Sequence, residues 1–474
     1  MGIPRVAAEP SADATAAASG QLAWSAVLAY SLPGIGTSFL FTLMTVLFMN
    51  FGTDVLLVSS VAIGNILLAC KVWAAVADPL AGFLSDRTRS RFGRRKPWVL
   101  ASALPIALFS LMLWAPPQEL AGSGLIAWLT LAVFGFYTAS TLFEVPNLAL
   151  GAQLSYDPRA RGRLFGTRQL VRSIGLFGAF SIGATALEDL ATARETARVL
   201  ALSAGIFTAL TIALSMWATP AELQGAGGGR PENPVRAVRD VWGNPHARLL
   251  LTVYFIEMFA IGAVGTLVPY LTRYVILMPG RLSEMLIVYV LPAVVSIPAW
   301  VWLGNRYEKR DVWLAAMVMA AVGFSLLLFL SEGGWVLMTV SSLLAGTAMG
   351  CGQSLGVALK AEIVDADELA TGQRKDGSYF AAWSFVGKLG GALMIWVVGA
   401  ALGWAGYAAP LPIGEGGALV DQPQTELVKN TLRMLVGGIP ALGFGLGAFL
   451  FRRFALTRDE HARIRRALDA RAES

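Results

Sequence analysis

Residues 70–99, CKVWAAVADPLAGFLSDRTRSRFGRRKPWV, join a hydrophobic run to a dense basic cluster. Lys71 and Asp78 lie inside the run, which ends in a loop that carries Arg87, Arg89, Arg91, Arg94, Arg95 and Lys96. A charge within a membrane span is costly and is usually functional. A basic loop beside such a span indicates the cytoplasmic side of the membrane. The stretch therefore predicts a membrane helix, its orientation and a first candidate site.

The composition of the whole chain supports this interpretation. Of the 474 residues, 55% are hydrophobic and 14% are charged, whereas a soluble domain has about 25% charged residues. The mean hydropathy is +0.60. The net charge of +6 is explained by topology and by attraction to anionic lipids. We therefore expect the lipid bilayer as a partner and no nucleic acid.

Enzyme and cofactor motifs are weak. GQSLG at 352–356 fits a nucleophile elbow, but that motif needs a strand–turn–helix context and here it lies within a hydrophobic run. The chain has no phosphate-binding P-loop sequence, so ATP is not the expected energy source. Cys70 and Cys351 both lie in apolar runs, which favours two packed thiols over a disulfide. We expect neither an enzyme nor a cofactor or resident metal.

Hydrophobic runs of about 20 residues, the length needed to cross a bilayer, predict an all-α membrane protein with twelve transmembrane helices. They lie near 24–50, 54–83, 97–115, 124–154, 164–187, 196–217, 248–277, 282–304, 312–330, 335–361, 378–405 and 430–451. The loops assigned to one side are rich in arginine and lysine, whereas those on the other side are poor in them. The positive-inside rule then places both termini in the cytoplasm of a cell, or inner, membrane.

The longest predicted inner connection, 218–247, contains AGGGRPENP and reads as a loop. It divides the chain into a tail (1–22), a six-helix bundle (23–217), a central loop (218–247), a second six-helix bundle (248–452) and a C-terminal tail (453–474). A basic loop follows both the second and the eighth span. This echo suggests duplicated halves around a central cavity, as in many secondary transporters.

Four segments resemble the glycoside–pentoside–hexuronide:cation symporter family of the major facilitator superfamily. They are FGTDVL (51–56), ADPLAGFLSDRTRSRFGRRKPW (77–98), FEVPNLALGAQLSYDPRARGRL (143–164) and EIVDADELATGQRKDGSYFAAWSFVGKLGGALMIWVVGAALGWAGY (362–407). The last is the most specific, because it joins an acidic stretch, a TGxR turn and an intramembrane lysine in order. The resemblance implies a monomeric transporter that moves a sugar or glycoside together with a cation by alternating access.

The resemblance also implies a cation site. Two aspartates four residues apart on the second helix form it in the family; Asp78 matches the second and Ala74 stands where the first is expected. Lys71 lies two helical turns before Asp78 and could neutralise it, and Lys388 matches the family's lysine near the cation. Because one carboxylate is missing, we favour H⁺ as the coupling ion. Na⁺, which Asp78 would bind, is the second choice, and uncoupled transport is the third.

Substrate contacts are expected from the same comparison. Glu144 matches a sugar-binding aspartate, because a carboxylate accepts two hydroxyl donors at once. Arg168 is the nearest match to a sugar-contacting arginine, with Arg172 as the competing assignment. Ser38 stands near the position of a second sugar-binding aspartate. Aromatic residues that could stack on a sugar ring include Tyr137 and Trp383.

A gate is expected where the basic loop 86–96 meets the acidic stretch 362–368. Its predicted members are Asp86, Arg87, Arg94, Arg95, Asp365 and Arg374. Pairs between these segments would close the cytoplasmic side and break as the cavity turns inward. Two alternatives stay open: a carrier of lysolipid or another amphiphile on the same fold, which a related branch of the family suggests, and a membrane receptor or scaffold that transports nothing.

Overall fold

The computed structural model describes residues 22–154, 157–186, 189–220, 239, 241–372, 375–413 and 418–473. The helices of the N-terminal half are α2 (Trp24–Ser31), α3 (Pro33–Val46), α4 (Phe48–Asn50), η1 (Phe51–Val55), α5 (Ser60–Arg87), α6 (Lys96–Trp114), α7 (Gly122–Gln153), α8 (Pro158–Gly178), η2 (Ala179–Gly183), α9 (Ala184–Ala186) and α10 (Ala193–Ala218). They follow the six predicted spans of this half. The predicted N-terminal tail lies almost wholly outside the described residues.

The C-terminal half is built in the same way. Its helices are α12 (Pro245–Ile261), α13 (Val264–Tyr270), η3 (Leu271–Val275), η4 (Pro279–Arg281), α14 (Leu282–Val295), α15 (Ile297–Arg306), α16 (Lys309–Ser325), η5 (Leu326–Phe329), α17 (Trp335–Thr371), α18 (Asp376–Ala405), α19 (Glu426–Arg433), η6 (Met434–Gly438), α20 (Ile439–Phe451) and α21 (Arg458–Glu473). A short hairpin of β1 (Leu411–Ile413) and β2 (Ala418–Val420) is antiparallel, with Leu411 opposite Val420.

Within the described residues, eleven helical segments are long and apolar enough to cross a membrane. The remaining predicted span, 164–187, corresponds to α8, η2 and α9. Five arginines lie on α8 (Arg159, Arg161, Arg163, Arg168 and Arg172), and they lower its hydropathy below that of the others. The architecture therefore follows the twelve predicted spans, with the difference that part of α8 carries charged side chains.

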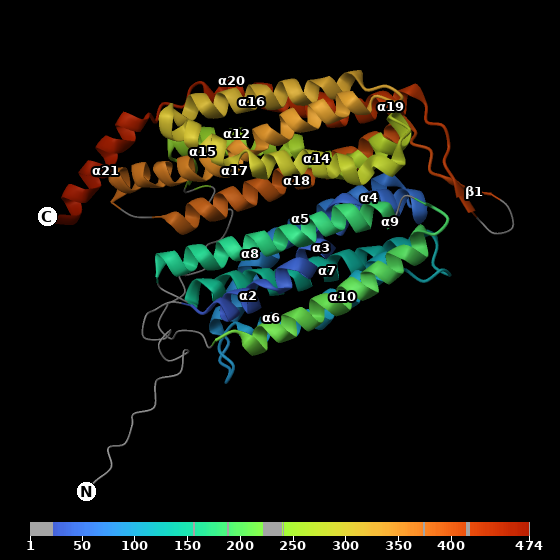
Figure 1. Ribbon diagram of the computed structural model, residues 1–474, viewed down its shortest axis with the longest axis horizontal. Helices are drawn as coiled ribbons and strands as arrows, with labels where there is room; N and C mark the ends of the chain where they lie inside the picture. Colours follow the sequence, from blue (N-terminus) through green and yellow to red (C-terminus); the bar gives the residue numbers. More distant parts are fainter. Residues whose placement is uncertain are drawn as a thin grey trace, which may run out of the picture.

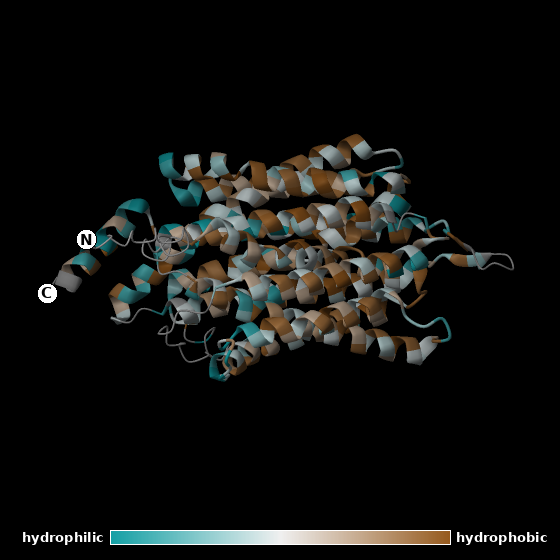
Figure 2. Ribbon diagram, turned by 60° about the horizontal axis from the view of Figure 1, so that its bottom comes forward, coloured by the Kyte–Doolittle hydropathy of each residue, from teal (hydrophilic) through white to brown (hydrophobic). Residues whose placement is uncertain are grey.

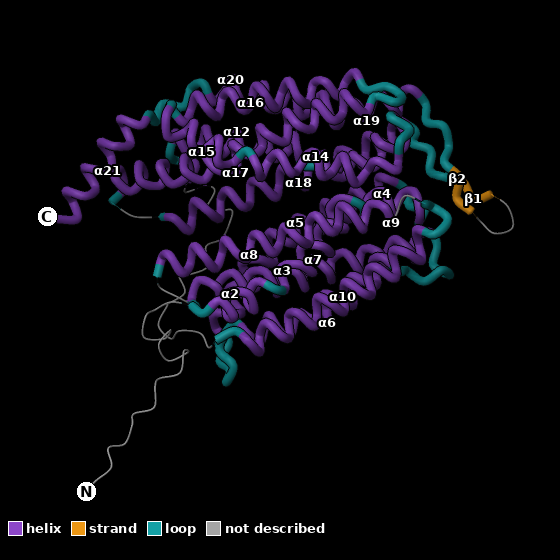
Figure 3. The backbone as a smooth tube through the Cα atoms, viewed as in Figure 1, coloured by secondary structure: helices purple, strands orange, loops and turns teal. Residues whose placement is uncertain are grey.

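The helices form two bundles that lie side by side (Figure 1). The N-terminal bundle is drawn in blue to green and the C-terminal bundle in yellow to red. The end of α10 and the whole of α21 lie at one end of the molecule, which we call the tail end. β1 and β2 mark the opposite end, which we call the strand end (Figure 3). Hydrophobic residues occupy the middle and hydrophilic residues concentrate towards the two ends (Figure 2), as a bilayer requires.

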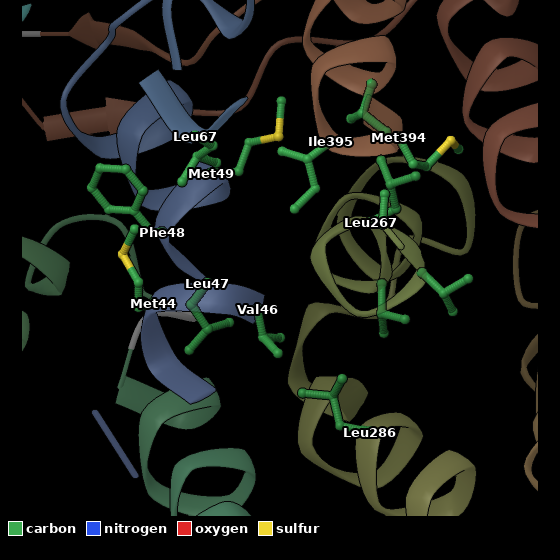
Figure 4. Packing of buried hydrophobic residues seen from close by; sticks show 14 of the residues in the cluster. Met44, Val46, Leu47, Phe48, Met49, Leu67, Leu267, Leu286, Met394 and Ile395 are labelled. Carbon is green, nitrogen blue, oxygen red and sulfur yellow. The ribbon is translucent and has the colours of Figure 1, made fainter. Parts of the chain in front are cut away.

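The seam between the bundles runs along α5 and α18. Gly64 and Gly399 allow the backbones to touch there, because a Cβ on Gly399 would lie 3.0 Å from the Gly64 Cα. The Ser60 hydroxyl donates to the Gly399 carbonyl at 3.1 Å. Buried apolar side chains continue the seam, and Figure 4 shows Val46 and Leu67 of one bundle facing Leu267 and Ile395 of the other.

The first and seventh spans end in the same unusual backbone. Each closes with a π-helical turn, η1 or η3, followed by a leucine with positive φ, Leu57 (57°) or Leu277 (62°). The amide of Val58 donates to the Gly52 carbonyl as that of Met278 donates to the Thr272 carbonyl. A non-glycine residue with positive φ is uncommon, so this shared geometry supports the duplication that the basic loops suggested.

The predicted C-terminal tail contains a helix, α21, that packs against α17. It is held through Asp365 of α17, which lies 3.1 Å from His461 Nε2 and 3.5 Å from Arg465 Nη1. The sequence of this segment is strongly charged, so a span is excluded, but its helical pairing with an acidic partner was not anticipated.

Candidate substrate and coupling site

A cavity of about 470 Å³ lies between the two bundles. Its walls come from α3, α5, α6, α7, α8 and α18. Much of the lining is apolar, and charged groups project from α5, α7, α8 and α18. The polar uncharged side chains in the lining are Thr37, Thr45, Ser140, Thr141 and Ser384. The cavity therefore combines a large apolar surface with a few polar groups, which is the usual make-up of a small-molecule site.

An ion pair between Asp78 and Lys388 crosses the cavity. Asp78 belongs to α5 in the N-terminal bundle and Lys388 to α18 in the C-terminal bundle. Both side chains are about one-third exposed. The Thr141 hydroxyl donates to Asp78 Oδ1 at 3.0 Å. The pair joins the two bundles. A change in the charge of either residue therefore alters a contact that helps to set the relative position of the bundles.

Lys71 and Ala74 line the same cavity. The Lys71 ammonium faces the α18 backbone, where a Cβ on Gly391 would lie 3.8 Å from its Nζ. Asp78 pairs with Lys388. The charge that neutralises Asp78 therefore comes from across the cavity and not from Lys71, two turns away on α5. Ala74 is 7% exposed and adds no oxygen ligand beside Asp78.

Glu144 on α7 is held by two arginines of α8. Arg168 donates to its Oε1 at 2.8 Å, and Arg172 donates to both carboxylate oxygens at 2.9 and 3.0 Å. Arg172 lines the cavity with Glu144, whereas Arg168 is buried behind it. Both arginines that the sequence left as alternatives therefore contact the carboxylate, and Arg172 is the one placed to reach a ligand.

The remaining expected substrate residues divide into two groups. Tyr137 lines the cavity and packs edge-on against Phe41, with ring centroids 6.0 Å apart. Ser38 and Trp383 are buried outside the lining. Trp383 packs on Tyr379 with ring centroids 5.5 Å apart, and its neighbour Ser384 occupies the cavity wall instead.

Asp54 forms a contact between the bundles at the strand end. It is fully buried on η1. Tyr274, at the equivalent position of η3, donates to its Oδ2 at 2.9 Å, and Tyr407 donates to its Oδ1. Arg273 lies 3.9 Å away. These partners all belong to the C-terminal half, so the carboxylate bridges the two bundles.

Neighbouring groups complete this contact, which we call the strand-end cluster: Asn50, Thr53, Asp54, Tyr270, Arg273, Tyr274 and Tyr407. Asn50 donates to Asp54 at 2.7 Å, and the Thr53 and Tyr270 hydroxyls lie 2.7 Å apart. Burial, and then the Asp54 charge, raise the pKa of Tyr407 above its usual value, so this phenol stays protonated and donates. FGTDVL contained the signal, a carboxylate at the end of a span, but nothing in it indicated partners in the other half.

Acidic residues at the tail end pair within their own half. Glu362 contacts Lys309, Asp367 lies 3.5 Å from Lys375, and Asp365 contacts α21. On the other bundle Asp86 pairs with Arg95 at 2.7 Å, and Arg87 lies over the Phe83 ring. Arg94 lies in the loop before α6. Arg374 lies outside the described residues. The bundles draw apart towards this end (Figure 1), where the cytoplasmic gate was expected to open.

The described residues hold no group of three or more histidine, cysteine or acidic side chains that could bind a metal ion. Cys70 and Cys351 are both free thiols, and both are buried.

A family model described as "MFS/sugar transport protein" matches residues 29–458. The chain belongs to this family. The transporter is 25% identical over 447 residues to the glucuronide carrier protein homolog of Escherichia coli, covering 91% of this chain and 92% of that protein. It is 25% identical to the isoprimeverose transporter of Lactiplantibacillus pentosus, covering 90% and 87%.

A sodium-dependent lysophosphatidylcholine symporter of Danio rerio is 24% identical, covering 83% of this chain and 78% of that protein. Among solved structures, the nucleoside transporter NupG matches with a TM-score of 0.65 and 13% identity, covering 91% of this chain and all of that one, which supports the fold alone. The expected membership of the glycoside–pentoside–hexuronide symporters is confirmed. The protein is a multi-pass membrane transporter of the symporter type and not an enzyme.

Proposed function

We propose that this transporter carries a sugar or glycoside together with a proton, and that Asp78 carries the proton. The observation that supports this most strongly is the Asp78–Lys388 ion pair across the cavity. Protonation of Asp78 removes its charge and releases Lys388, so a single proton alters the contact between the bundles. Substrate and proton are thereby linked through one conformational change.

The surroundings of Asp78 favour a proton over Na⁺. The Lys388 ammonium contacts Asp78 Oδ2, and the Thr141 hydroxyl donates to Oδ1, so both carboxylate oxygens already have partners. Ala74 supplies no second carboxylate. A proton needs one carboxylate oxygen, whereas Na⁺ needs a shell of several oxygen ligands.

The sugar would bind between Glu144, Arg172 and Tyr137. A carboxylate accepts hydroxyl groups and a guanidinium donates to them, and the Tyr137 ring offers an apolar face to the ring carbons. All three line the cavity. An acidic sugar would suit Arg172 and Lys388, in keeping with the name of the glucuronide carrier that the chain resembles.

The closed strand-end cluster and the basic residues of the tail end support an assignment of the conformational state. With the tail end in the cytoplasm, as the positive-inside rule predicts, the structure is an inward-facing state. The outward-facing state would break the strand-end cluster and bring the basic loop 86–96 against the acidic end of α17.

A lysolipid is the second candidate substrate. Leu40, Phe41, Ile106, Phe136 and Phe143 form an apolar wall in the cavity, which would suit an acyl chain. The chain is 24% identical to the sodium-dependent lysophosphatidylcholine symporter of Danio rerio.

Uptake into proteoliposomes tests both candidates. Radiolabelled glucuronide, isoprimeverose and lysophosphatidylcholine would be offered in turn, with a pH gradient, with a Na⁺ gradient and with neither. The proposal expects uphill uptake of a sugar with the pH gradient alone. Uptake of lysophosphatidylcholine but of neither sugar would select the second candidate, and uphill uptake that needs Na⁺ would contradict proton coupling.

A further inference from the structure

Glu257 is a buried carboxyl group that the transport cavity does not include. It lies on α12 in the interior of the C-terminal bundle and is 5% exposed. The Trp313 side chain of α16 lies near enough to the carboxyl group to act on it. The Oε1 atom has no hydrogen-bond partner among the described residues. The side chain therefore has few groups that could stabilise a negative charge.

Several helices packed against Glu257 carry charged or titratable groups. On α16, Lys309 pairs with Glu362 and Arg310 pairs with Asp311. Tyr254 lies one turn before it on α12, and Cys351 and Lys360 of α17 interact with it electrostatically. On α18, Lys388 pairs with Asp78 and Tyr379 bonds to Asn244. The facing helix α20, IPALGFGLGAFLF, has no titratable residue. Lys360 is thus the one cation among these groups that is placed to act on Glu257.

Lys360 is engaged with aromatic rings. Its Nζ lies 4.2 Å from the centre of the Tyr254 ring and 5.5 Å from that of Trp383. A cation over an aromatic face is stabilised without a counter-ion. Because Tyr254 is one turn from Glu257 on the same helix, a rotation of the lysine side chain would bring its ammonium towards the carboxyl group.

We propose that Glu257 is a second proton-binding site, separate from Asp78, and that Lys360 controls whether the proton is held. An ionised carboxylate buried without a paired cation is so costly that such groups take up a proton instead. In the state described here Glu257 is protonated and Lys360 rests on Tyr254 and Trp383. When Lys360 turns to Glu257, the O–H bond breaks, the proton passes to water and an ion pair between α12 and α17 replaces it.

Protonation of Glu257 would act within the C-terminal bundle. Protonation of Asp78 acts on the contact between the bundles, whereas Glu257 and Lys360 both belong to helices of one bundle. The Trp383 ring contacted by Lys360 precedes Ser384, which lines the cavity. The protonation state of Glu257 would therefore be linked to the packing of α12, α17 and α18 behind the cavity wall. A role for this second proton in transport rests on the proposed proton coupling. The binding of a proton by Glu257 does not depend on that coupling.

Infrared difference spectroscopy tests proton binding directly. The purified full-length protein in lipid nanodiscs would be titrated from mildly acidic to alkaline pH, and the carbonyl stretch of protonated carboxylic acids would be followed. The wild type should show a band that is lost as the pH rises. That band should be missing in Glu257→Gln and kept in Asp78→Asn. Lys360→Gln should raise the midpoint of its loss by about one pH unit or more, because an opposite charge favours the ionised form.

Two results would overturn the proposal: identical spectra for wild type and Glu257→Gln at every pH, and a Glu257 band that neither pH nor Lys360→Gln changes. Glu257→Asp, which should keep the band, guards against loss of folding in the glutamine variant, and the elution profile on size exclusion checks each protein. Because this readout uses no substrate, it stands if Asp78 proves not to couple transport. Loss of uphill uptake in Asp78→Asn with no Glu257 band would leave the proposed function intact and refute the second site.

Discussion

The strand-end cluster should hold the two bundles together in the proposed inward-facing state, and Asp54→Asn should weaken this contact. The substitution keeps the size of the side chain and removes its charge. Two hydroxyls of the other bundle, those of Tyr274 and Tyr407, donate to this carboxylate. A hydrogen bond to a charged group contributes about 1.5–3 kcal/mol and one to a neutral group about 1 kcal/mol.

The loss over the two bonds is therefore about 2 kcal/mol, which corresponds to a shift of roughly 30-fold in the equilibrium between the two states. The shift acts on transport only through this equilibrium, because Asp54 is outside the cavity lining. The variant should fold, since the neutral amide still has hydrogen-bond partners around it.

Pulsed electron–electron resonance would measure this shift. Spin labels at Gln118 and Ser331, two exposed positions in strand-end loops of different bundles, would report the distance between the bundles. Asp54→Asn should populate a longer distance that is rare in the wild type. Asp189→Asn is the matched control, because within the described part of the chain the Asp189 side chain bonds only in its own loop, to Ala191 and Thr192. Unchanged distances in Asp54→Asn, or an equal change in the control, would refute the role given to the cluster.

Further substitutions test the cavity and the seam. Asp78→Asn should abolish uphill accumulation while exchange of substrate continues, as measured by uptake with and without a pH gradient; full accumulation would exclude Asp78 as the coupling group. Glu144→Gln should raise KM by about tenfold or more through loss of a charged acceptor, and an unchanged KM for every probe would remove it from the site. Ala74→Asp should make uptake respond to Na⁺, and no response would separate this position from cation selection. Gly399→Val should cost about 1–3 kcal/mol of stability, because its Cβ would lie 2.5 Å from the Ser60 carbonyl oxygen; Gly445→Val, with open space around it, should leave the melting temperature unchanged.

Hydrophobicity and charge predicted the helices of this protein well, because a span must be apolar for its full length and each backbone group must be satisfied within it. The fifth span shows the limit of that reasoning. Arg168 and Arg172 could be seen to lie within it, but only the packing of α7 on α8 shows that both reach Glu144.

Contacts between segments that are distant in the chain could not be predicted from the sequence. Asp78 and Lys388 can each be recognised from the sequence as a charge within a span, but only the packing of α5 on α18 shows that they pair. Ser38 is a small polar residue in the right span, but the helix turns it away from the cavity lining. The sequence alone does not reveal the role of Asp54, because its partners lie on η3 and after α18 and no local pattern links them.

Proton movement driven by substrate tests the central claim most directly. Proteoliposomes loaded with a pH-sensitive dye would receive glucuronide or isoprimeverose from outside, with no imposed gradient and with Na⁺ absent. Wild-type protein should acidify the lumen on addition of a transported sugar, and Asp78→Asn should move the sugar down its gradient without acidification. Sugar entry by the wild type with no change of luminal pH, or equal acidification by the variant, would contradict the account.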